Sequence, residues 1–209
     1  IVIVIIAAAA TAVVVVVVDD DNPLVPEDDE DAKTEEAYAR SRSRLGADIA
    51  EGRIGEERVA VLKPTTFMNE SGRALGAVLR FYKIEPERLF VFHDELDLAP
   101  GKVRVKLGGG SAGHNGLKSV SAHIGPDYWR VRIGIGHPGD KDLVHGYVLS
   151  EFSKAESLWL EKLVDATGEA APLLLGGEEN DFMTRVALLA PPPAKTRKNE
   201  TSEEESNGI

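Results

Sequence analysis

Polar side chains that could bind and activate a substrate gather in two stretches of the chain, on either side of an alternating strand candidate. The first, His93–Leu98, reads His-Asp-Glu-Leu-Asp-Leu and follows an apolar run. A buried strand that ends in an acid such as Asp94 is a familiar way to orient an imidazole in a hydrolase. The second, Gly108–Leu117, joins a glycine run to His114 and Asn115 at an expected helix start. This combination suits a site that positions a polar substrate and a water molecule.

A third polar stretch runs from Lys63 to Gly72, and its central residue is Asn69. Pro64 stops the preceding strand, so Asn69 falls at the junction between a strand and a helix. Ligands of α/β proteins bind at the carboxyl ends of strands, where the Asn69 amide could hold a substrate carbonyl or a water molecule. Taken alone, a helix-capping role for Asn69 or Ser71 is the simpler interpretation.

The glycine run does not match the common nucleotide-binding motifs. It lacks the Lys-Ser/Thr pair of a P-loop, and its spacing differs from that of a dinucleotide-binding fingerprint. Glycines nevertheless allow a backbone to approach a bulky ligand, and free N–H groups at a helix start near Asn115 can bind phosphate. Basic residues expected nearby could form a phosphate-contacting patch, although each could singly be a solvated charge: Arg104, Lys106, Lys118 and Arg132.

His93 beside Asp94 is also compatible with a metal site. The other histidines, however, have no recognised ligand spacing, and the chain has no cysteine to supply a thiolate ligand or a disulfide. We therefore expect neither a metal nor a cofactor. The absence of cysteine fits a reducing compartment.

The hydrophobic pattern predicts which elements carry these residues. Apolar runs and alternating patterns predict strands at residues 58–62, 89–92, 102–107 and 130–136. Helical periodicity, with a capping box from Ser153 to Glu156, predicts helices at residues 70–82, 116–124 and 153–175. Because strands and helices interleave along the chain, we expect an α/β sandwich with a partly parallel sheet.

The first 18 residues form an apolar run of Ile, Val, Ala and one Thr. This run is long enough to span a membrane, but its valines and isoleucines favour a buried first strand, and acids follow immediately. Residues 1–31 use only nine residue types and contain no glycine. We hypothesise that the printed sequence of residues 1–36 departs in part from the encoded one. N-terminal sequencing or an intact mass that returned the printed residues would refute this.

The net charge of −11 is unevenly distributed. Residues 1–36 hold ten acids and one base, so the rest of the chain holds 25 acids and 23 bases. A local basic face that binds nucleic acid is therefore compatible with the acidic composition. We expect one domain over residues 1–190, followed by a charged, disordered tail at residues 191–209.

Four motifs, in this order and spacing, resemble bacterial peptidyl-tRNA hydrolase from about residue 40 to about residue 190: Phe67–Gly72, His93–Leu98, Gly108–Leu117 and Arg130–Gly139. The resemblance implies a monomeric, cytoplasmic enzyme with a three-layer α/β/α sandwich around a mixed, partly parallel sheet. Its implied reaction is hydrolysis of the ester that joins a stalled peptide to the 3′ ribose of tRNA.

The resemblance also implies roles for single residues. Asn69 would hold the water or the peptide carbonyl, Asp94 would orient and charge-stabilise the catalytic imidazole, and Asn115 would bind substrate and help place the water. The remaining residues implied to contact the substrate line the cleft beside the ester (Phe67, with Met68 behind it), lie at the cleft edge near the tRNA end (Gly113 and His114), or contact acceptor-stem phosphates (Arg104, Lys106 and Arg132).

The sequence departs from this family at its start. The family's glycine motif is replaced by alanines, and Asp21 stands where the family has its general-base histidine. An aspartate, with a pKa of about 3.9, is a weak base near neutral pH and would face the carboxylate of Asp94. Three hypotheses follow: an active hydrolase whose residue 21 is a histidine, a catalytically inactive RNA-binding relative, and a metal-dependent hydrolase that uses His93 and Asp94. We favour the first.

Overall fold

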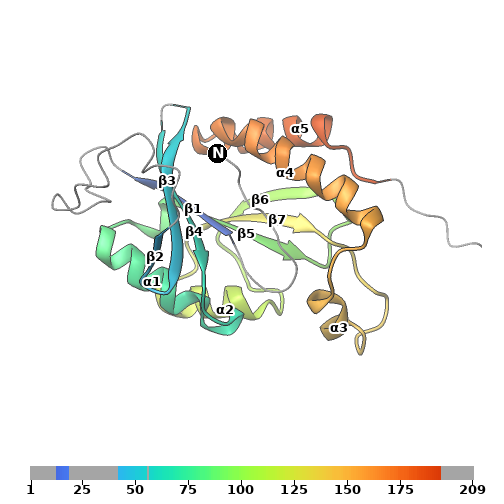
Figure 1. The fold of residues 1–209 in the computed structure, drawn as a ribbon, viewed down its shortest axis with the longest axis horizontal. Helices are drawn as coiled ribbons and strands as arrows, with labels where there is room; N and C mark the ends of the chain where they lie inside the picture. Colours follow the sequence, from blue (N-terminus) through green and yellow to red (C-terminus); the bar gives the residue numbers. More distant parts are fainter. Residues whose placement is uncertain (1–12, 19–41, 56, 194–209) are drawn as a thin grey trace, which may run out of the picture.

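The computed structural model describes residues 13–18, 42–55 and 57–193, in which seven strands form one sheet (Figure 1). The strands are β1 (Val13–Val18), β2 (Arg42–Arg44), β3 (Ala47–Ile54), β4 (Glu57–Pro64), β5 (Leu89–Glu95), β6 (Val103–Leu107) and β7 (Trp129–Gly134), in the spatial order β2-β3-β4-β1-β5-β7-β6. Of the strand pairs described, β5–β7 is parallel and the others are antiparallel. The predicted mixed, partly parallel sheet is therefore confirmed.

Helices cover both faces of this sheet and give the predicted three layers (Figure 1). The α-helices are α1 (Ser71–Tyr82), α2 (Asn115–Ile124), α3 (Val144–Leu149), α4 (Lys154–Leu175) and α5 (Glu179–Leu189), with short 3-10 turns η3 (Met68–Glu70) and η4 (Pro86–Arg88). Strand β5 shows how one sheet serves two cores. Its Leu89 and Val91 pack in the core with α1 and α2, whereas Phe90 and Phe92 pack in the core with α4 and α5.

The predicted elements are present, with ends that differ by a few residues from the predicted ranges. The Ser153–Glu156 capping box begins α4 as predicted. The first strand is confirmed in its described part, since β1 lies between β4 and β5 with Val14 and Val15 buried. The predictions for residues 1–12, Asp21 and the tail from residue 194 lie outside the described residues. No helix in the described part of the chain is long and apolar enough to cross a membrane.

Helices α1 and α2 lie side by side and run in the same direction. Near their starts Gly72 approaches Ser119, and one turn later Gly76 approaches His123 and Ile124. Both helices consequently begin at the same end of their layer. Asn69, in η3 just before α1, and Asn115, the first residue of α2, therefore lie at that end together.

Candidate functional site

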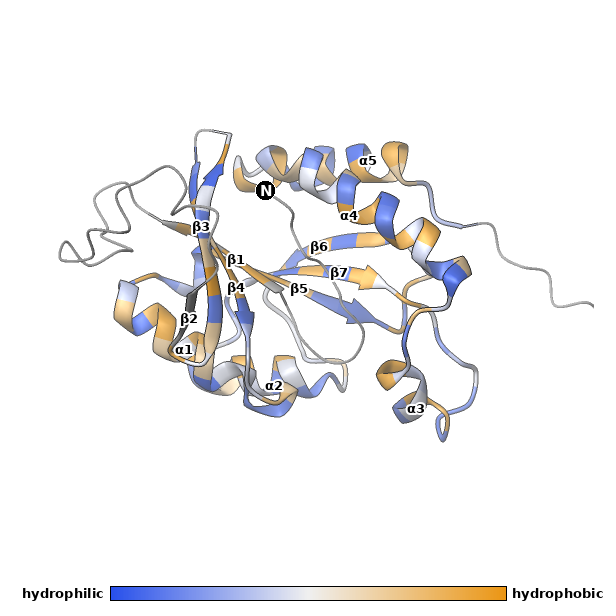
Figure 2. Ribbon diagram, in the orientation of Figure 1, coloured by the Kyte–Doolittle hydropathy of each residue, from blue (hydrophilic) through white to orange (hydrophobic). Residues whose placement is uncertain are grey.

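The site is built around the carboxyl end of β5. Figure 2 shows this strand changing along its length from hydrophobic to hydrophilic. The change falls at His93-Asp94-Glu95, directly after the buried Phe92. The parallel neighbour β7 ends beside β5, with Arg132 opposite His93. Polar groups of both strands therefore lie near the carboxyl ends of these strands.

Asp94 is hydrogen-bonded to His114, twenty residues further along the chain. The Nε2 atom of His114 lies 3.0 Å from Oδ1 of Asp94. The other ring nitrogen of His114, Nδ1, accepts the backbone N–H of Leu117 at 3.2 Å and so caps the start of α2. These partners assign the tautomer: Nδ1 is the acceptor, and Nε2 carries the proton that it donates to Asp94.

This arrangement gives His114 a connecting role. With Nε2 donating and Nδ1 accepting, the neutral ring has no free lone pair in this arrangement and cannot take a proton from water. The His114 side chain is also largely buried, with 12% of it exposed. It ties the end of β5 to the start of α2, which carries Asn115. The sequence did not predict this bond, and a contact of His114 with the tRNA end stays a prediction.

Two opposing effects act on the acidity of Asp94. Burial alone would raise the pKa of its carboxyl group, but the hydrogen bond from His114 and the proximity of both histidines hold the pKa below its ordinary value. Asp94 is therefore a carboxylate at neutral pH. The side chain is 31% exposed, so the carboxylate is also reachable from solvent.

His93 lies against His114, with ring centroids 5.3 Å apart and the rings nearly perpendicular. Its Nδ1 lies 2.7 Å from the backbone oxygen of Asp94, and its buried Nε2 has no hydrogen-bond partner among the described residues. Burial, with a smaller contribution from His114, lowers the pKa of His93 to about 4. His93 is thus a neutral, buried ring. Within the described residues, no group of three or more His, Asp or Glu side chains could hold a metal ion.

The two asparagines are exposed at neighbouring helix starts. Asn69 lies in η3 and Asn115 begins α2. Phe67, just before η3, has 80% of its surface exposed, whereas Met68 is half-buried. Exposure of a large aromatic side chain beside exposed amides suits a surface that receives a ligand.

Three residues of the predicted basic patch, Arg104, Lys106 and Arg132, lie on one face of the sheet, whereas Lys118 lies exposed on helix α2. Arg104 and Lys106 of β6 pair with Arg132 and Arg130 of β7 in the antiparallel register. Their alternating neighbours, Val103, Val105, Val131 and Ile133, belong to the core with α4 and α5, so the four cations lie on the side of α1 and α2. Arg104 and Lys106 are exposed.

Arg132 is already engaged within the chain. Its Nε donates to Oε2 of Glu95 at 2.9 Å, and Glu95 is buried while 29% of the Arg132 side chain is exposed. The charge of Arg132 is therefore partly neutralised, and only its exposed part is left for a phosphate.

Arg130 was not among the predicted site residues, yet it holds the glycine run in place. Its guanidinium is buried, lies 4.7 Å from the centre of the Tyr128 ring and donates to the backbone oxygen of Gly110. Gly109 and Gly113 in this run have φ values of 106° and 86°, which favour glycine. Strand alternation placed residue 130 on this face, but no sequence signal distinguishes a buried arginine from a solvated one.

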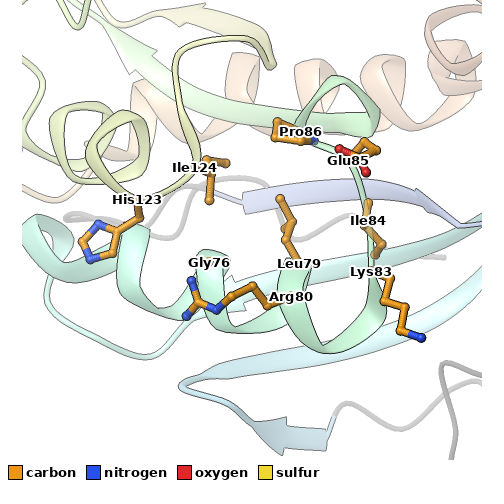
Figure 3. A pocket seen from close by; sticks show the side chains of 9 residues that line it. All are labelled: Gly76, Leu79, Arg80, Lys83, Ile84, Glu85, Pro86, His123 and Ile124. Atoms are coloured by element: carbon orange, nitrogen blue, oxygen red, sulfur yellow. The ribbon is translucent and has the colours of Figure 1, made fainter.

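A groove of about 380 Å³ opens at the far ends of α1 and α2 (Figure 3). Its lining residues are Gly76, Leu79, Arg80, Lys83, Ile84, Glu85, Pro86, His123 and Ile124. None of the predicted site residues line this groove. We call this end of the α1–α2 pair the groove end. The opposite end of the two helices, with residues 67–72 and 113–119, is called the site end.

The structure is a three-layer α/β/α protein with an acid at the end of β5 and two exposed amides at the starts of neighbouring helices. The family model "Peptidyl-tRNA hydrolase" matches residues 29–198. The chain therefore belongs to the peptidyl-tRNA hydrolase family, and the resemblance drawn from its motifs is confirmed.

Individual relatives agree with this assignment. The chain is 57% identical over 152 residues to the peptidyl-tRNA hydrolase of Dinoroseobacter shibae, covering 73% of this chain and 65% of the relative. It is 56% identical over 164 residues to that of Parvibaculum lavamentivorans, covering 78% and 80%. The crystal structure of the Acinetobacter baumannii peptidyl-tRNA hydrolase superposes with a TM-score of 0.67 at 36% identity, covering 75% of this chain and 81% of that one. With 65% of the Dinoroseobacter shibae relative covered, the chain spans less than two thirds of that relative's length.

Proposed function

We propose that this protein hydrolyses the ester bond between peptide and tRNA in peptidyl-tRNA and so recycles tRNA from stalled or aborted translation. Family membership supports the reaction class. The observation that carries the proposal is the convergence of Asp94 with Asn69 and Asn115 at the site end, through the Asp94–His114 bond and the shared start of α1 and α2.

In the proposed reaction a water molecule attacks the ester carbonyl carbon. A base takes the proton from the water, the bond from the carbonyl carbon to the 3′ oxygen breaks, and that oxygen leaves with a proton. Amide N–H groups of Asn69 or Asn115 stabilise the negative charge that develops on the carbonyl oxygen. The carboxylate of Asp94, which uses one oxygen for His114, offers the other to a base imidazole and stabilises its charged form.

The base itself is proposed to occupy position 21, outside the described residues and before the range that the family model matches. His93 and His114 are poor candidates, because one is a buried neutral ring and the other uses both nitrogens. An aspartate at position 21 would give a slow enzyme, and a histidine would give a fast one.

We further propose that tRNA is bound by the residues that the family resemblance singled out. Arg104, Lys106 and the exposed part of Arg132 would contact acceptor-stem phosphates, and the glycine run held by Arg130 would lie beside the tRNA end. The enzyme would act as a cytoplasmic monomer without a metal or a cofactor.

The test is turnover of an N-acetyl-aminoacyl-tRNA by the parent chain and by the variant Asp21→His, measured with and without EDTA. We expect hydrolysis in EDTA, faster in Asp21→His. If neither chain releases the amino acid although both bind tRNA, the inactive RNA-binding alternative is correct. Loss of activity in EDTA would instead favour a metal-dependent reaction. The faster of the two chains is called the active background below.

A further inference from the structure

Helices α1 and α2 come into backbone contact at the site end, between Gly72 and Ser119. A Cβ atom placed on Gly72 would lie 2.0 Å from the backbone oxygen of Ser119 and 2.4 Å from its carbonyl carbon. Real Cβ atoms essentially never come closer than 3.0 Å to a neighbouring atom, and a backbone cannot swing aside as a flexible side chain can. Only glycine fits position 72 while the two helices keep this distance.

A hydrogen bond also joins α1 and α2 at this contact between Gly72 and Ser119. The N–H of Gly72 is one of the donors in the first turn of α1 that have no acceptor within their own helix. It donates to the side-chain oxygen of Ser119 at 3.1 Å, across 47 residues of sequence. Ser119 is buried, and its backbone oxygen accepts Nδ1–H of His123 at 2.8 Å. The crossing is therefore held by a specific bond as well as by packing.

A second glycine contact lies one turn nearer the helix starts. A Cβ atom on Gly116 would lie 3.2 Å from Cγ of Met68 and 2.9 Å from Cε1 of His114. Met68 directly precedes Asn69, and Gly116 directly follows Asn115. The two contacts thus fix the relative position of the segments that carry the two exposed asparagines.

The groove end offers a direct comparison, because α1 has another glycine there. A Cβ atom on Gly76 would lie 3.3 Å from the terminal NH1 of Arg80 and 3.6 Å from side-chain atoms of His123 and Ile124. These neighbours are side chains, and the nearest is the flexible end of an arginine. Of these two glycines of α1, only Gly72, at the site end, meets the backbone of α2.

We propose that Gly72 and Ser119 are positioning residues, which set the separation of Asn69 and Asn115 and thereby the fit of the site to the transition state. The proposal rests on the proposed ester hydrolysis. If the crossing widens, the two asparagines move apart and no longer reach the carbonyl oxygen and the water together. Because bound substrate relies also on tRNA contacts elsewhere, widening lowers kcat and leaves KM nearly unchanged.

The decisive variant is Ser119→Ala in the active background, because it removes the acceptor of the Gly72 N–H without adding atoms. We expect kcat to fall by about ten-fold, as small misplacements of catalytic groups do, with KM within about two-fold of the parent value. Side-chain amide NMR signals of Asn69 and Asn115 should shift as well. Gly72→Ala should act in the same direction and more strongly, provided that thermal unfolding shows a folded protein.

The control is Val186→Ala, a cavity-forming change of a buried residue in the core with α5, on the other face of the sheet. It lowers stability without touching the crossing and should leave kcat unchanged. If Ser119→Ala keeps kcat within about two-fold of this control, or raises KM alone, Ser119 and Gly72 are not positioning residues. Absence of turnover in both the parent chain and Asp21→His would instead reject the proposed hydrolysis, so the two failures are distinguishable.

Discussion

The two ends of the α1–α2 pair differ in how they are built and in what they can do. At the site end the helix backbones touch at Gly72 and Ser119, and a histidine caps α2 while bonding to Asp94. At the groove end the contacts are between side chains, and Arg80 and Lys83 line an open groove. Arg80 and Lys83 lie at the carboxyl end of α1, where the partial negative charge of the helix dipole stabilises cations. Helix starts, in contrast, bind anionic and polar groups of ligands. A cationic groove is therefore not by itself a phosphate site.

The largest expected effect concerns the acid of the site end. In the proposed mechanism the carboxylate of Asp94 stabilises an imidazolium, and Asp94→Asn removes that charge. We therefore expect kcat for peptidyl-tRNA hydrolysis to fall by about 1,000-fold in the active background. Asp97→Asn, three residues further on and exposed, serves as the matched control and should stay close to the parent. Equal rates for the two variants would remove Asp94 from the mechanism.

A second prediction concerns the buried His93. The pKa of His93 in the folded protein is about 4, below the ordinary 6.5. Between these two pH values the unfolded chain therefore binds a proton on His93 that the folded protein does not bind. The contribution of His93 to the free energy of unfolding is therefore fully present above pH 6.5. It decreases by about 3 kcal/mol as the pH falls toward 4. Urea unfolding at pH 7 and pH 4.5 measures the difference.

The same pH series in variants isolates the contribution of His93. His93→Asn should show a weaker pH dependence than the parent, whereas His145→Asn, which changes an exposed histidine of α3, should retain the parent dependence. An unchanged dependence in His93→Asn would mean that other groups cause the acid destabilisation.

The third prediction uses the two glycines of α1 that lie one turn apart. Gly72→Ala should destabilise the protein by about 2 kcal/mol, the usual size of an overpacking cost, because its Cβ meets backbone. Gly76→Ala should be neutral or stabilising by up to about 1 kcal/mol, since Arg80 can move and alanine favours the helix. Denaturant unfolding of both variants measures this contrast, and similar values would show that the two ends pack alike.

The smallest effect is expected in tRNA binding. Lys106→Ala should weaken binding and reduce the slope of log K against log salt by about 1, because one phosphate contact is lost. Lys83→Ala, at the groove end, should leave both quantities unchanged. Binding titrations at several salt concentrations measure both quantities for the two variants. If only Lys83→Ala weakens tRNA binding, the RNA is bound at the groove end instead.

Local pattern was sufficient for much of the fold and for the identity of the candidate residues. Alternation located β6 and β7, and the i, i+3, i+4 spacing of Leu75, Val78 and Leu79 located α1. Asp94 and Asn69 stood out because each follows a predicted strand, at residues 89–92 and 58–62. Strand β3 was missed because its residues Ala47–Ile54 include alanines and a glycine, and its pairing with β4 supplies most of its order.

Long-range contacts account for what the sequence could not reveal. The Asp94–His114 bond spans 20 residues, the Arg132–Glu95 bond spans 37 and the Gly72–Ser119 bond spans 47. Each partner is an ordinary polar residue by itself, and only the folded chain shows which of them meet. The same holds for Arg130, which is buried against the Tyr128 ring and bonded to the glycine run.

The position of β1 has a consequence for the order of assembly. This strand comes early in the sequence but pairs with β4 and β5, so that Val13 lies opposite Phe92 across 79 residues of chain. The middle of the sheet therefore cannot close during synthesis until β5 has emerged from the ribosome. Such sequence-distant pairings slow folding, since loop-closure entropy is lost before the contacts form. Asp94, at the end of β5, is thus made with the same segment that completes the sheet, and the candidate site forms only once the sheet can close.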